Sequence, residues 1–144
     1  MTEAELDAFA ARFQAADIPR RAWTHQAHLW IGAWHVHRFG AEEALLRLRT
    51  GIRRLNEANG VANTAEGGYH ETITAAYVRL LASALDQDGA RSFEVRVGAV
   101  LAGPLGDKAA LARHYSPELL MSSRARAGWV APDREPLPDP PPSR

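Results

Sequence analysis

Residues 69–86 carry the clearest structural signal in the sequence. Their apolar residues recur at the spacing of a single helix face, namely at Ile73, Ala76, Tyr77, Leu80, Leu81 and Ala84. The pattern predicts a helix over 69–86, with His70 in its first turn on the inward stripe. We find no alternating apolar and polar run, the pattern typical of a half-buried strand. The sequence therefore predicts an all-α fold.

Further helices are predicted over residues 2–16, 24–39, 41–58 and 92–101, with short helices near 107–114 and 117–122. Four residues are expected to cap helix N-termini, namely Thr2, Thr24, Ser92 and Ser116. Glu5 completes a capping box with Thr2, and Gly40 is expected to end the helix over 24–39. The simplest arrangement is a four-helix-type bundle with additional short C-terminal helices.

The end of the chain differs in composition. Six prolines fall within residues 131–144, and proline has no backbone N–H for a helix interior. We expect one helical domain over 1–130 and an extended, Pro-rich C-terminal tail over 131–144.

Composition excludes several classes of protein. The chain has no cysteine, so disulfides and thiolate metal sites are ruled out. Its 17 basic and 17 acidic residues balance, which argues against a protein that mainly grips nucleic acid. Neither a signal peptide nor an apolar run long enough to span a membrane is apparent. We expect a cytoplasmic protein of bacterial origin that binds no nucleic acid and no membrane.

Three histidines form the candidate metal site. His25 and His28 are three residues apart at the start of one helix, and His70 begins another. If the two helix starts lie at the same end of the bundle, the three imidazoles converge on a site for a divalent transition metal (Zn, Fe, Ni, Cu or Mn). Glu71 is the candidate catalytic residue, as a general base, an extra ligand or a partner of an imidazole N–H. The alternative is that these histidines are structural.

Other polar residues are weaker candidates. His35 and His37 are weaker candidates for a metal site. His35 is expected to be a buried polar residue or to support a metal ligand, and His114 is expected to be a local cap, with a smaller chance of completing the site. The arginines Arg53, Arg54 and Arg79 could bind a carboxylate or phosphate group, although arginines on outer helix faces are usually solvated. The backbone N–H groups of residues 67–69 could bind an anion, although a glycine hinge is the simpler interpretation.

Several segments together resemble an uncharacterised family of short bacterial proteins. They are WTHQAHL at 23–29, GYHETIT at 68–74, YSPELLMSS at 115–123 and ARAGWVAPD at 125–133. The resemblance implies no activity, but it makes the two histidine segments look like a signature. The chain is more distantly similar to DinB-type helical bundles, which hold a metal with three histidines. There a single histidine precedes an H-x-x-x-H pair, whereas here an H-x-x-H pair comes first, so only the architecture carries over.

Three functional hypotheses follow. The first is a metal-dependent enzyme (hydrolase, lyase or oxygen-using) that acts on a small molecule through His25, His28, His70 and Glu71. The second is a protein that binds a small molecule or metal without turnover. The third is a helical domain that binds a protein partner, and a homodimer is left open.

Overall fold

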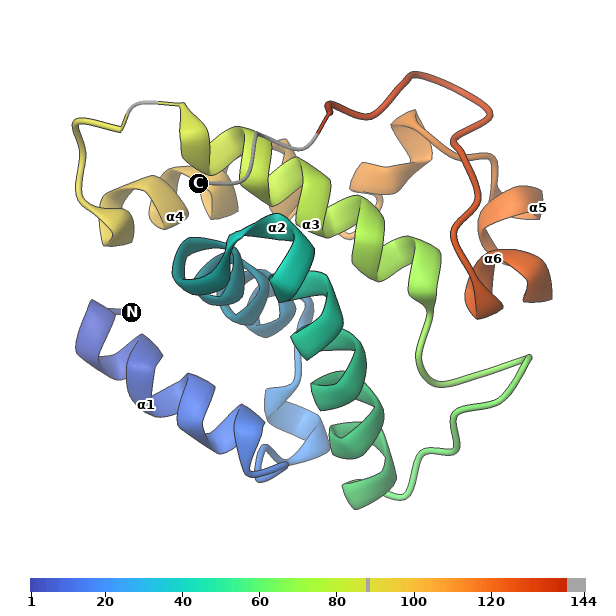
Figure 1. The fold of residues 1–144 in the computed structure, drawn as a ribbon, viewed down its shortest axis with the longest axis horizontal. Coiled ribbons are helices and arrows are strands. Elements are labelled where there is room, and N and C mark those ends of the chain that lie inside the picture. The colour runs from blue at the N-terminus through green and yellow to red at the C-terminus, as the bar shows by residue number, and fades with distance from the viewer. Residues whose placement is uncertain (88, 140–144) are drawn as a thin grey trace.

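The computed structural model describes residues 1–87 and 89–139 of the chain, where helices are joined by loops (Figure 1). Its α-helices are α1 (Glu3–Gln14), α2 (His25–Ala58), α3 (Glu71–Asp86), α4 (Phe93–Ala102), α5 (Pro117–Leu120) and α6 (Ser123–Ala127). Short 3-10 helices are η1 (Arg20–Ala22), η2 (Pro104–Gly106) and η3 (Ala110–Arg113). No strand occurs in the described ranges, which confirms the predicted all-α class. None of the helices found there is long and apolar enough to cross a membrane.

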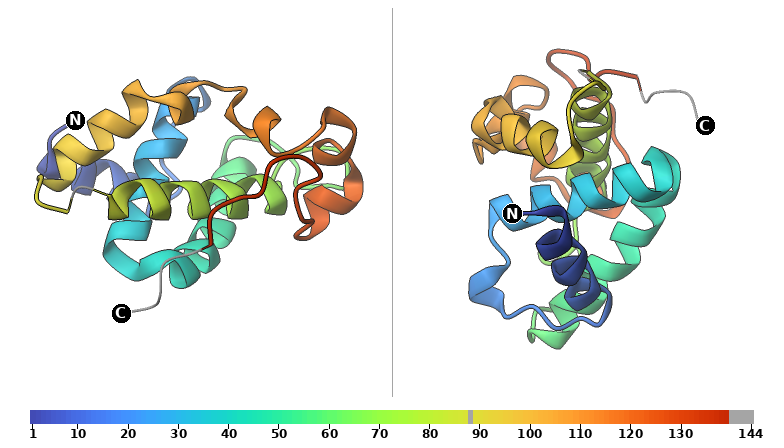
Figure 2. Two further views of the ribbon diagram at one scale, coloured as in Figure 1. Left: turned by 90° about the horizontal axis from the view of Figure 1, so that it is seen from above. Right: turned by 90° about the vertical axis from the view of Figure 1, so that its left-hand side faces the viewer.

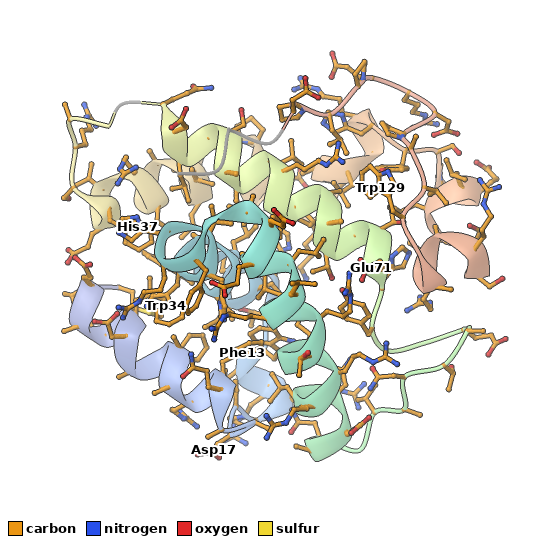
Figure 3. All side chains as sticks on the ribbon, in the orientation of Figure 1. Phe13, Asp17, Trp34, His37, Glu71 and Trp129 are labelled. Atoms are coloured by element: carbon orange, nitrogen blue, oxygen red, sulfur yellow. The ribbon has the colours of Figure 1, made fainter. Side chains whose placement is uncertain are left out.

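Helix α1 begins as predicted and packs on α2. The Thr2 hydroxyl accepts the Glu5 backbone N–H, and the Glu5 carboxylate accepts the Thr2 backbone N–H, so the capping box is present. The buried face of α1 ends at Phe13, which lies between α1 and α2 together with Trp34 (Figure 3). A Cβ atom at Gly51 would overlap the Phe13 ring, so glycine lets the ring approach α2 closely.

The two helices predicted over 24–39 and 41–58 are both present, and they meet directly at Gly40, where the first was expected to end. α2 runs from His25 to Ala58, and its backbone departs from helical geometry at Gly40, with φ 80° and ψ 165°. This conformation is essentially restricted to glycine. Gly40 therefore turns the chain without a separating loop, and the two arms of α2 point in different directions (Figure 1).

Helix α3 is the central element, because it is packed on two sides. The residues Val78, Leu81 and Leu85 belong to the main core with α1, α2 and α4. Ala76 belongs to a second core, against which Ile73, Tyr77 and Leu80 are partly buried. The predicted single inward stripe was therefore incomplete, since α3 presents a different face to each core.

The second core is built by the C-terminal part of the chain, which crosses α3 (Figure 2). Its buried members include Leu111, Tyr115, Ala125 and Val130. The Thr72 hydroxyl on α3 donates to the carbonyl oxygen of Gly128 (2.8 Å) and accepts the N–H of Val130 (3.1 Å). These bonds fix the segment that follows α6 against the start of α3.

Residues 131–139 of the predicted tail are among those that the structure describes. The tail backbone pairs with the segment near η3, where the N–H of Arg134 donates to the carbonyl oxygen of His114 and the N–H of Glu135 donates to that of Arg113. Residues 140–144 of the tail lie outside the described residues. The short helix predicted near 107–114 is the 3-10 helix η3, and α6 was not predicted.

Candidate functional site

His25 and His28 both use one ring nitrogen for a backbone contact. The Nε2 of His25 donates to the carbonyl oxygen of Leu105 at 3.0 Å, which joins the start of α2 to η2. The Nδ1 of His28 donates to the carbonyl oxygen of Thr24 at 2.7 Å. The exposed His28 ring also lies against Trp23, with 3.9 Å between ring centroids.

His70 is the N-cap of α3 rather than a residue of its first turn. Its Nδ1 accepts the backbone N–H of Ile73 at 3.1 Å, and its Nε2 donates to the carbonyl oxygen of Leu120 at 2.6 Å. This pair of bonds requires a neutral ring with its proton on Nε2. Burial of the side chain lowers the pKa of His70, which favours the same neutral form.

The three predicted metal ligands are not brought together. In residues 1–87 and 89–139, no group of three or more His, Cys, Asp or Glu side chains is placed so that it could hold a metal ion. Binding of a transition metal by His25, His28 and His70 stays a prediction, which metal analysis of the purified protein would test.

The other three histidines contact their own helix or a neighbouring segment. His35 is buried, and its Nδ1 donates to the carbonyl oxygen of Ile31 at 2.7 Å. His37 stacks on Phe93 with 4.1 Å between ring centroids. The Nδ1 of His114 donates to the carbonyl oxygen of Glu135 at 2.8 Å. The burial of His35 agrees with the expectation of a buried polar residue, and the His114 contact joins the end of η3 to the tail.

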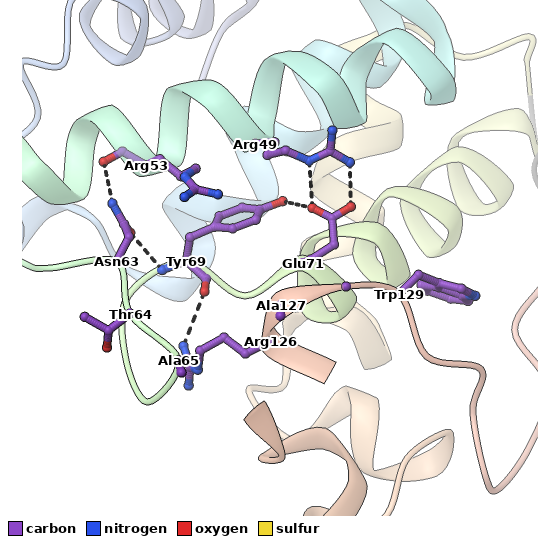
Figure 4. Close-up of a pocket in the computed structure, with 11 residues that line it drawn as sticks. Arg49, Arg53, Asn63, Thr64, Ala65, Tyr69, Glu71, Arg126, Ala127 and Trp129 are labelled. Carbon is purple, nitrogen blue, oxygen red and sulfur yellow. Dashed lines mark hydrogen bonds and ion pairs between the residues drawn. The ribbon is translucent and has the colours of Figure 1, made fainter. Parts of the chain in front are cut away.

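A pocket of about 580 Å³ opens where the second arm of α2, the loop before α3 and α6 meet (Figure 4). It is lined by Arg49, Arg53, Asn63, Thr64, Ala65, Tyr69, Glu71, Arg126, Ala127, Gly128 and Trp129. Glu71 is the one residue of the predicted metal site among them. The predicted catalytic residue therefore lies in the wall of this pocket.

Glu71 is held by two neighbours. Arg49 donates to both carboxylate oxygens, from Nε to Oε1 at 2.8 Å and from Nη2 to Oε2 at 2.6 Å. The Tyr69 hydroxyl donates to Oε1 at 2.8 Å. The hydrogen bonds from Arg49 are the main reason that the pKa of Glu71 is lowered, whereas burial raises the pKa of Tyr69. Glu71 is therefore a fixed carboxylate at neutral pH.

Two further guanidinium groups line the pocket. Arg53 lies over the Tyr69 ring, with 5.8 Å from its Cζ to the ring centroid. Arg126, on α6, donates from Nη1 to the carbonyl oxygen of Gly68 at 2.8 Å. Gly68 has φ 80°, and a Cβ atom there would overlap the carbonyl oxygen of Ala62, so this position requires glycine.

Asn63 organises the loop that forms one wall. Its Oδ1 accepts the backbone N–H of Tyr69 at 2.9 Å, and its Nδ2 donates to the carbonyl oxygen of Arg53 at 3.1 Å. The N–H of Gly67 donates to the Thr64 hydroxyl at 3.2 Å. Two of the three N–H groups suggested as an anion site at 67–69 are thus already used within the loop.

The charge of the lining is unbalanced. Three guanidinium groups and one carboxylate line the pocket, which leaves two net positive charges. Among the suggested anion-binding arginines, Arg53 lines this pocket. Arg79 instead lies over the Trp129 ring, with 4.4 Å from its Cζ to the ring centroid. Sequence reasoning missed Arg49 and Arg126; the four-residue spacing of Arg49 and Arg53 was the available signal, because it places both on one helix face.

Comparison with known proteins finds no matching family model, no similar curated protein and no similar solved structure.

Proposed function

We propose that this protein binds a small, doubly charged anion in the pocket around Glu71. The observation that carries the proposal is the lining of three arginines against one carboxylate that is already paired. A ligand with two negative charges would neutralise the two positive charges in excess. Carboxylate and phosphate groups both match the planar, multiply donating guanidinium fork.

Arg53 is the principal candidate for contact with the ligand. Its guanidinium is placed by the Tyr69 ring, and no ion pair to it occurs within the described part of the chain. Arg126 contributes from the opposite wall, and one of its nitrogens is held by the Gly68 carbonyl oxygen. The pocket volume falls in the range of about 300–1,000 Å³ that is usual for small-molecule sites.

Binding without turnover has better support than acid–base catalysis. A general base that works near neutral pH usually has a pKa close to that pH, whereas the Arg49 contacts lower the pKa of Glu71. Its carboxylate is therefore better suited to fixing Arg49 and receiving hydrogen bonds than to taking up a proton.

Isothermal titration with succinate, propyl phosphate and inorganic phosphate tests the proposal. We expect Arg53→Gln to weaken binding by about tenfold or more, because it removes charged hydrogen bonds worth about 1.5–3 kcal/mol. Arg54→Gln is the matched control, because Arg54 is also exposed on α2 but does not line the pocket. Equal affinity losses in the two variants, or no binding of any of the three anions to the unaltered protein, would contradict the proposal.

A further inference from the structure

The Glu71 carboxylate has one acceptor position to spare. An ionised carboxylate offers about four lone-pair positions, two on each oxygen. Oε1 accepts two hydrogen bonds, from Arg49 Nε and the Tyr69 hydroxyl, and Oε2 accepts one, from Arg49 Nη2. The remaining position therefore lies on Oε2.

That position belongs to a constrained group in the pocket. The Glu71 side chain is only 12% exposed, and it lines the same cavity as Arg53 and Arg126. The bidentate contact with Arg49 prevents the carboxylate from turning away (Figure 4). Oε2 keeps its hydrogen bond from Arg49 Nη2 when a ligand fills the cavity, but its remaining position loses contact with water. A ligand that supplies a hydrogen-bond donor at that position restores the lost interaction, so it should bind more tightly than an otherwise equal ligand without a donor.

We propose that the ligand carries a hydroxyl group that donates to Oε2 of Glu71, in addition to its two negative charges. This inference rests on the proposed function and narrows it to hydroxylated dianions, such as a hydroxy-dicarboxylic acid or a phosphorylated polyol. A hydroxyl group fits better than an ammonium group, because three guanidinium groups line the pocket and would repel a cation.

Two neighbouring side chains suit such a ligand. The Thr64 hydroxyl lines the cavity and accepts the N–H groups of Glu66 and Gly67, which leaves its own proton available to a ligand oxygen. Trp129 lines the cavity and is 39% exposed, and the part of its ring that Arg79 does not cover offers an apolar surface for the C–H groups of a carbon skeleton.

Matched ligand pairs test the inference by isothermal titration of the full chain. L-malate is compared with succinate, and glycerol 3-phosphate is compared with propyl phosphate, so that each pair differs in hydroxyl groups while both members keep their anionic groups. We expect the hydroxylated member of at least one pair to bind about tenfold or more tightly. The pair that shows the preference identifies the anionic group as carboxylate or phosphate.

The Glu71→Gln variant supplies a second measurement. Its amide keeps the size of the side chain but removes the ionised acceptor. The two members of each ligand pair should therefore bind this variant with nearly equal affinity. If this variant does not fold, as judged by its circular dichroism melt, the ligand pairs on the unaltered protein decide alone.

The possible failures are distinguishable. Equal affinities within both pairs, or an undiminished preference in folded Glu71→Gln, would overturn the hydroxyl inference and leave the anion-binding function standing. If none of the four dianions binds, both the inference and the proposed function are wrong.

Discussion

At the scale of single residues, His70 shows how one side chain can join two parts of a fold. One ring nitrogen caps α3 at Ile73, and the other holds the end of α5 at the Leu120 carbonyl oxygen. The bond from Ile73 needs an unprotonated Nδ1, so protonation would remove the cap, whereas Nε2 donates to Leu120 in either protonation state. His70 is therefore a structural link next to the pocket, whatever the outcome of the metal prediction.

We expect His70 to make the protein less stable in mild acid. Its pKa is lowered in the folded state by burial, so the unfolded chain binds the proton more readily. The contribution to stability is present above the unfolded pKa of about 6.5 and is lost as the pH falls from there toward the folded pKa. Urea unfolding at pH 7 and pH 5 should show a smaller pH dependence for His70→Asn than for the unaltered protein.

Asparagine is the informative substitution at this position, because it can still cap a helix but does not titrate. His35, whose pKa is also lowered by burial, remains in both proteins and contributes equally to each. An identical loss of stability between the two pH values in both proteins would show that His70 does not have the protonation state described above.

At the scale of helices and loops, the elements that depend on near neighbours were predicted well. All four predicted N-caps are present, at Thr2, Thr24, Ser92 and Ser116. Each cap joins residues three apart, so the sequence window contains both partners. The cap at His70 was missed, because imidazole is not among the usual capping side chains.

Gly40 sets the shape of the longest element, and its replacement should be costly. We expect Gly40→Ala to destabilise the protein by about 1–3 kcal/mol, because a side chain strains the backbone at φ 80° and ψ 165°. Gly98→Ala is the control within a helix, since Gly98 is exposed on α4 and an added Cβ meets nothing. The Gly98→Ala substitution should raise the free energy of unfolding by about 0.5–1 kcal/mol.

Both effects can be measured as free energies of unfolding in urea. An unchanged stability of Gly40→Ala would mean that the two arms of α2 do not need this glycine conformation, and that the bend has another cause.

At the scale of the whole molecule, the site depends on contacts that no local pattern contains. Arg49 lies 22 residues before Glu71 in the sequence, and Arg126 lies 58 residues after Gly68, whose carbonyl oxygen it contacts. The C-terminal segment reaches the pocket because Thr72 and the second core hold it against α3. Glu71 and Arg53 are functional candidates from the sequence alone, but they line one pocket only because α2, α3 and α6 pack together.

The same dependence explains the histidine assignments. The prediction of a shared site assumed that the starts of α2 and α3 lie at one end of a regular bundle. In the structure, His25 contacts η2 and the Tyr77 ring of α3, whereas His70 contacts α5. Helical periodicity gives the face of a residue on its own helix, but it does not give the neighbour that this face meets.

The central claim is that an anion binds among Arg53, Glu71 and Arg126. Its most direct test is a titration of isotopically labelled protein with succinate and with inorganic phosphate, followed by two-dimensional ¹H–¹⁵N spectra. We expect the largest amide shifts in two segments that are distant in sequence, residues 63–71 and 126–129, because both border the pocket. Largest shifts elsewhere, for example on α1 or α4, or no saturable shifts with either anion, would contradict the claim.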